Sequence, residues 1–139
     1  MFLVKSAGLH AEWVATIAFY KAVHVVEAVF DAHLKQHSHG HDSRIETLKS
    51  PIFHALFTPY RPLFGASLVA RYLEDSSSRK FDDKPTATTS FHSFANYLTP
   101  QEVVEKLVKK RLYTLEQESL NFLTNAGKSA LKKIEPAKL

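Results

Sequence analysis

The sequence contains no cysteine, and this absence restricts the chemistry that its 139 residues can perform. Without a thiol the chain can form no disulfide, no thiolate zinc site and no cysteine nucleophile. A chain without disulfides suits a reducing compartment, and we expect a cytoplasmic protein.

Glycine is also scarce, with four residues scattered along the chain. A phosphate-binding loop needs closely spaced glycines so that the backbone can approach the phosphate, and the sequence has no such cluster. The serines likewise lack the flanking glycines of a nucleophile elbow. The sequence therefore indicates neither of these enzyme classes.

Long hydrophobic runs are missing as well. No uninterrupted apolar run approaches the roughly 20 residues that a membrane-spanning helix requires. The N-terminal residues 1–5 are too few and too weakly charged for a signal peptide. We therefore expect no membrane association.

What the chain does contain is the composition of one globular domain, residues 1–139. Hydrophobic residues make up 45% and charged residues 23%, which suffices for a buried core. The net charge of +4 favours an acidic partner such as RNA or a nucleotide, because lysine and arginine displace the counterions of phosphates. A basic protein without such a partner would carry the same charge.

The spacing of apolar residues predicts helices. Residues 10–33 lack proline and glycine and repeat apolar side chains every three or four positions, which predicts a long central helix. A short second helix is predicted over residues 44–49, capped by Asp42 or Ser43. A third is predicted over residues 52–73, interrupted or kinked near Pro59 and Pro62.

The second half of the chain predicts one further long helix. Thr99 and Glu102 flank Pro100 in the pattern of a capped helix start, and Gly127 is a natural end for that helix. Residues 74–98 are predicted as an exposed loop with a short helix around Phe94 at its far end, and residues 128–139 as a basic tail. No strand or hairpin signal is evident. The prediction is an all-α protein of four helices with a long third connection.

A polar stripe crosses the first predicted helix. Tyr20, His24, Glu27 and Asp31 are spaced four, three and four residues apart, so they share one helix face. Charged groups on an apolar helix need partners, and arginines from the second and third helices, Arg44 and Arg71, are the expected donors. The stripe could form a site in which His24 is an acid, a base or a phosphate ligand. It could equally be an internal network that fixes helix register, or the edge of a dimer surface.

Four histidines cluster after this helix, at positions His33, His37, His39 and His41. His33 and His37 would lie one turn apart if the helix continued, which is a workable pair for zinc or nickel. The spacing matches no defined metal signature, however, and a flexible histidine-rich loop also binds metals adventitiously. Protonation of these side chains below pH about 6.5 would make binding to an acidic partner depend on pH.

Several segments together resemble the HEPN family of small helical proteins. The first helix is similar to the family pattern of a tryptophan followed by Phe-Tyr-x-Ala-x-His-x-x-Glu-Ala, and the third helix ends in Ala-Arg-Tyr as it commonly does in that family. The positions that carry the resemblance are Trp13, Phe19, Tyr20, His24, Glu27 and Ala28; Ser38, His39, Ser43 and Arg44; Tyr60, Leu63, Ser67, Ala70, Arg71 and Tyr72; and Thr99 to Glu102.

The resemblance implies an antiparallel four-helix bundle that forms a homodimer. Many members of the family are metal-independent endoribonucleases, often toxins neutralised by a nucleotidyltransferase-like partner, and others bind RNA or nucleotides without catalysis. No cofactor is implied. The residues expected to bind are Tyr20, His24, Glu27, Asp31, His41, Arg44, Arg71 and Tyr72.

The sequence departs from the family at the catalytic motif. Ribonuclease members carry an arginine followed by a histidine after four to six residues, and none of the five arginines here has a histidine at that distance. The leading hypothesis is therefore a HEPN-like domain that binds RNA, a nucleotide or a partner protein. The alternatives are an endoribonuclease that uses His24 or His41 with Arg44 or Arg71, and a metal-binding protein built on the histidine-rich loop.

Overall fold

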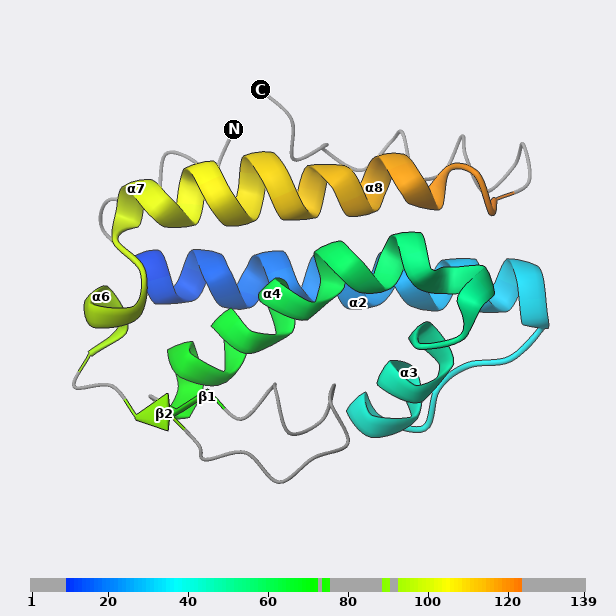
Figure 1. Ribbon diagram of the computed structural model, residues 1–139, viewed down its shortest axis with the longest axis horizontal. Coiled ribbons are helices and arrows are strands. Elements are labelled where there is room, and N and C mark those ends of the chain that lie inside the picture. Colours follow the sequence, from blue (N-terminus) through cyan, green and yellow to red (C-terminus); the bar gives the residue numbers. More distant parts are fainter. Residues whose placement is uncertain (1–9, 73, 76–88, 91–92, 124–139) are drawn as a thin grey trace.

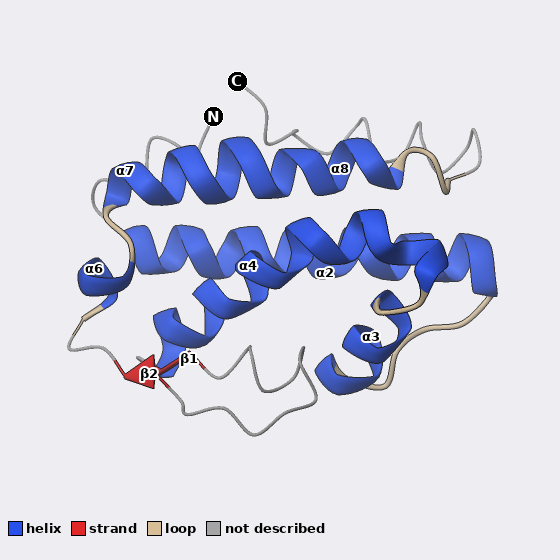
Figure 2. Cartoon of the chain, in the orientation of Figure 1, coloured by secondary structure: helices blue, strands red, loops and turns tan. Residues whose placement is uncertain are grey.

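The protein is mostly helical, which confirms the all-α prediction (Figures 1 and 2). The computed structural model describes residues 10–72, 74–75, 89–90 and 93–123, so the predicted basic tail lies outside the described residues. The last helix ends at Ser119, before the end predicted at Gly127, and residues 120–122 form a turn instead. The elements are α2 (Ala11–Leu34), α3 (His41–Leu48), η1 (Pro51–Phe53), α4 (His54–Tyr72), β1 (Glu74–Asp75), β2 (Thr89–Ser90), α6 (Phe94–Tyr97), α7 (Pro100–Glu102), η2 (Val103–Leu112) and α8 (Tyr113–Ser119).

Helix α2 is the centre of the fold, as its apolar pattern predicts. It packs against α4, η2 and α8. Ala15, Ala18 and Ala22 are completely buried, and these small side chains allow the neighbouring helices to approach closely. Ala28, which follows the same spacing, is exposed instead.

Helix α2 is also long and apolar enough to cross a membrane, contrary to the expectation from uninterrupted runs. Half of the apolar stretch is buried inside the protein, and the core helix of a globular protein meets the same criteria. The feature therefore carries no conclusion about membranes.

Helix α4 runs back along α2 in the opposite direction (Figure 1). It continues through Pro59 and Pro62, where an interruption or kink was predicted, although each proline removes one hydrogen-bond donor. Burial compensates for the missing bonds: Tyr60 and Leu63, on the same helix, are completely buried, and Tyr60 packs on Phe19 of α2.

The last helix consists of α7, η2 and α8 in succession and runs in the same direction as α2 (Figure 1). Thr99 caps it as predicted: its side chain accepts from the Glu102 N–H at 3.2 Å, and the Glu102 carboxylate accepts from the Thr99 N–H at 3.0 Å. The middle segment, η2, is wound as a π-helix. Val103 and Val108 are fully buried, whereas Val104, one of the valines predicted to point inward, is partly exposed.

Helix α3 begins at His41, three residues before the predicted start, and neither predicted cap is used. The N-cap is Gly40, which has no side chain to cap with. The Ser43 hydroxyl instead accepts from the His39 N–H at 3.0 Å and donates to the Gly40 carbonyl at 3.3 Å. The Ser43 hydroxyl therefore fixes the loop in front of the helix and does not cap the helix itself.

The segment between α4 and the last helix contains a feature that the sequence did not predict. Strands β1 and β2 pair antiparallel, with Glu74 opposite Ser90. Beyond them α6 forms the expected short helix, and its Phe94 side chain is buried.

Candidate functional site

An ion pair between Glu27 and Arg44 connects α2 to α3. The Arg44 Nε–H donates to Glu27 Oε1 at 2.9 Å, and the Ser38 N–H donates to Glu27 Oε2 at 3.1 Å. Arg44 is buried, with 7% of its surface exposed. The predicted contact between the polar stripe and an arginine of the second helix is therefore confirmed for this pair.

These contacts set the charge state of Glu27. Burial alone would raise the pKa of its carboxyl group, but the hydrogen bond from the Ser38 backbone and the charge and hydrogen bond of Arg44 outweigh burial. The pKa of Glu27 therefore lies below its usual value, and the ion pair is fully charged at neutral pH.

On its other side Arg44 contacts His41 at the start of α3. The Arg44 Nη1 and His41 Nδ1 atoms are 2.9 Å apart. Because a guanidinium group can only donate, Nδ1 must accept, so His41 is neutral and carries its proton on Nε2. Burial, followed by the positive charges of Arg44 and Arg71, lowers the pKa of His41, while Asp42 opposes this shift.

Tyr60 completes this buried polar group from α4. Its hydroxyl is fully buried and has no hydrogen-bond partner among the described residues. Burial raises the pKa of Tyr60 to about 12, although the charge of nearby Arg44 works against the shift. The site prediction did not include Tyr60; the only signal in the sequence is its place in the third-helix pattern.

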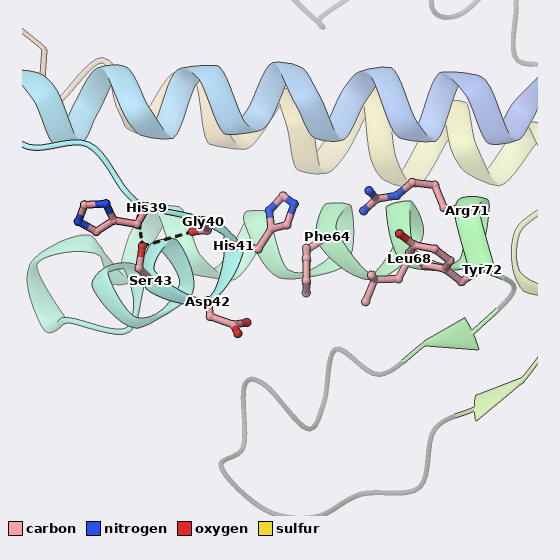
Figure 3. Close-up of a pocket in the computed structure, with 9 residues that line it drawn as sticks. All are labelled: His39, Gly40, His41, Asp42, Ser43, Phe64, Leu68, Arg71 and Tyr72. Atoms are coloured by element: carbon pink, nitrogen blue, oxygen red, sulfur yellow. Dashed lines mark hydrogen bonds between the residues drawn. The ribbon is translucent and has the colours of Figure 1, made fainter.

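A pocket of about 520 Å³ opens between the start of α3 and the C-terminal half of α4 (Figure 3). We call it the arginine–histidine pocket. Its lining residues are His39, Gly40, His41, Asp42, Ser43, Phe64, Leu68, Arg71 and Tyr72.

Arg71 and Tyr72 form the end of this pocket on α4. Figure 3 shows the Arg71 guanidinium group extending toward His41. The Arg71 Nε–H donates to the Ser67 carbonyl at 3.3 Å, and the guanidinium carbon lies 5.3 Å from the centre of the Tyr72 ring. Both side chains are exposed, so both can contact a ligand.

The other members of the polar stripe do not join this group. Tyr20 is 45% exposed, with its ring beside Phe19. Asp31 is exposed and faces His37, with Oδ1 and Nε2 3.4 Å apart. His24 is exposed and forms no hydrogen bond, ion pair or ring contact with any described residue, including both arginines. The structure therefore separates His24 from the arginine-centred site in which it was predicted.

The four clustered histidines also point to different partners. His33 packs against the rings of Phe53 and Phe122, and His37 lies near the carboxylates of the polar stripe. His39 and His41 belong to the pocket. In the described part of the chain, no three metal-binding side chains come together. The hypothesis of a metal site on the histidine-rich loop therefore has no assembled ligand set to support it.

The chain matches no known protein family, no curated protein and no solved structure. The function therefore has to be argued from the site.

Proposed function

We propose that this chain is a HEPN-like helical domain that binds RNA or a nucleotide in the arginine–histidine pocket. The observation that carries this proposal is Arg71, whose exposed guanidinium group extends into a pocket lined by two histidines. A guanidinium group forms paired, charge-assisted hydrogen bonds with phosphate oxygens.

The start of α3 supports the same ligand. The first N–H groups of a helix have no partner within the helix and attract anions, and this helix has no side-chain cap. Beside Gly40 the structure is open, because a Cβ atom there would meet nothing within 4 Å. A phosphate at this position would lie between the α3 backbone and Arg71.

Two further residues favour a nucleotide over a bare phosphate. The exposed Tyr72 ring can stack on a base, a contact worth about 1–3 kcal/mol in proteins that bind single strands. Asp42 is the one acidic residue that lines the pocket and would repel an isolated anion. Its carboxylate can accept hydrogen bonds from ribose hydroxyls.

A titration with a fluorescently labelled RNA and with a mononucleotide at low salt tests this proposal. Arg71→Ala should raise the dissociation constant about tenfold, since a lost charged contact is worth about 1.4 kcal/mol or more. Tyr72→Ala should also weaken binding, whereas Tyr72→Phe should not, because phenylalanine keeps the stacking surface.

The matched control is Arg111→Ala, which removes the same charge from η2, outside the pocket lining. Equal losses of affinity in Arg71→Ala and Arg111→Ala would contradict binding in the pocket. They would indicate nonspecific electrostatic attraction instead. No binding by the unaltered protein at low salt would contradict the proposal itself.

A second function, a metal-independent endoribonuclease, is favoured by the state of His41. With Nδ1 bonded to Arg44, the Nε2–H of the neutral imidazole can donate to a phosphate oxygen while Arg71 balances the negative charge that develops during cleavage. Cleavage of labelled RNA in the presence of a chelator, lost in both His41→Asn and Arg71→Ala, would support it. Cleavage that persists in either variant would exclude these two residues as its source.

The resemblance to HEPN proteins motivates three further proposals. These are the antiparallel four-helix bundle as the complete architecture, a homodimer, and a nucleotidyltransferase-like partner protein. An experimental structure, the mass of the protein in solution, and co-purification with the product of a neighbouring gene would test them in turn.

A further inference from the structure

One face of the central helix carries large apolar side chains that no described residue covers. Trp13 is 65% exposed, Tyr20 45% and Ile17 39%. They are three of the six large apolar side chains that are exposed in the described residues. The remaining faces of α2 pack against α4, η2 and α8.

These three residues belong to a continuous row along α2, which we call the α2 stripe. At about 100° per residue, its members fall within about 80° of one another around the helix. From Trp13 to Ala28 the row is about 23 Å long. The α2 stripe consists of Trp13, Ile17, Tyr20, His24, Ala28 and Asp31, of which every member is exposed.

We propose that the α2 stripe is the surface on which a second copy of this chain docks, with the two α2 helices antiparallel. In this arrangement two residues face each other when their numbers add up to about 41. Trp13, the largest side chain of the stripe, then faces Ala28 of the second copy, the smallest. Ile17 faces His24 of the second copy, and the two Tyr20 side chains meet near the two-fold axis.

This register also pairs a hydrogen-bond acceptor with a ring that can donate to it. It brings Asp31 opposite the exposed His10 of the second copy, and the symmetry forms that contact twice. A parallel pairing would instead place Trp13 against Trp13 and Asp31 against Asp31. The antiparallel arrangement therefore places the large Trp13 side chain opposite the small Ala28, and the Asp31 carboxylate opposite the His10 imidazole.

The composition of the α2 stripe argues against other binding partners, such as nucleic acid or a membrane. It contains no lysine or arginine, so it offers nothing to a phosphate backbone. It also ends in a histidine, a small alanine and an aspartate, which are unsuitable for insertion into lipid. A surface with an aromatic residue at its centre and few charges is typical of a protein interface.

The inference rests on the self-association proposed above and names its surface; it does not depend on the ligand pocket. Exchanging the large and the small side chain between positions 13 and 28 tests the proposed surface most directly. Trp13→Ala should raise the dimer dissociation constant by about tenfold or more, because it removes the two largest contacts. Ala28→Trp should also weaken the dimer, because tryptophan would then oppose tryptophan. The double variant Trp13→Ala with Ala28→Trp should restore association, because each tryptophan again faces an alanine.

The measurements are sedimentation equilibrium and light scattering over a range of concentrations, with circular dichroism to check that each variant is folded. Ile52→Ala is the matched control, because Ile52 is 51% exposed on η1, away from the stripe. It should leave the dissociation constant unchanged.

Trp13 gives an independent signal, because it is the only tryptophan in the chain. Its fluorescence emission should shift to shorter wavelength as concentration rises, with the same midpoint as dimer formation. A protein that stays monomeric at millimolar concentration would overturn both the homodimer and its surface. A dimer that persists in Trp13→Ala, or that the double variant does not restore, would overturn the surface alone. Short-wavelength emission from a monomer would show that another segment of the same chain covers the stripe, which also overturns the inference.

Discussion

At the scale of single residues, Arg44 has the most partners in the candidate site. It forms an ion pair with Glu27, donates to His41 and lies near the buried Tyr60 hydroxyl. The three partners come from α2, α3 and α4, so one guanidinium group connects three helices.

We expect Arg44→Ala to lower the free energy of unfolding by about 2–3 kcal/mol. The substitution leaves the Glu27 carboxylate without its ion pair, although Glu27 keeps some access to water, which limits the cost. Urea unfolding followed by circular dichroism measures the change. Arg111→Ala, which removes a partly exposed arginine elsewhere, should change stability by no more than about 0.5 kcal/mol.

His41 should make stability depend on pH. Its pKa is lowered in the folded protein, so its contribution is complete above the usual value of 6.5 and is lost as pH falls from there through the folded pKa. Protonation also breaks the bond with Arg44, because both groups would then be donors. The contribution of Glu27 is complete above pH 4.5 and is lost only as pH falls from there through its lowered pKa.

Unfolding measured at a series of pH values between 7.5 and about 5 tests this expectation. His41→Asn keeps an acceptor near Arg44 but cannot titrate, so its curve should be flatter than that of the unaltered protein. Parallel curves for His41→Asn and the unaltered protein would refute the role of His41.

At the scale of elements, the start of the last helix is the clearest local signal in the sequence. The capping pair of Thr99 and Glu102 was predicted from residue types alone, because both hydrogen bonds form within four residues. Thr99→Ala should therefore lower the free energy of unfolding by about 1 kcal/mol.

The control for this prediction is Thr58→Ala in α4. The Thr58 hydroxyl bonds to the His54 carbonyl inside the helix, an interaction that contributes little to helix stability. Thermal unfolding of both variants gives the comparison. A loss of stability in Thr99→Ala no larger than that in Thr58→Ala would contradict the capping role of Thr99.

Other element boundaries were not predictable, because contacts outside the local sequence determine them. Asp42 and Ser43 are both good capping residues, and nothing nearby shows that Ser43 instead bonds to His39 and Gly40. The early start of α3 coincides with the ion pair from Arg44 to Glu27, 17 positions away in the chain. Strands β1 and β2, at two residues each, are too short to show a period.

At the scale of the whole molecule, periodicity identified the faces of α2 but not what covers each face. The spacing correctly placed Tyr20, His24, Glu27 and Asp31 on one side of the helix. It did not show that Arg44 reaches only Glu27, that the loop before α3 reaches Glu27 and Asp31, or that His24 is left at the surface. Side chains on one helix face can therefore have quite different environments.

The short pairing of β1 with β2 has a consequence for how this protein can be altered. It holds residue 75 next to residue 89, so the ends of the connection are fixed independently of the thirteen residues between them. Doubling the length of a closed loop costs only about 0.6 kcal/mol in chain entropy. A reporter peptide inserted there would leave the helices and the arginine–histidine pocket in place, which makes this connection the natural attachment point for following the protein in a cell.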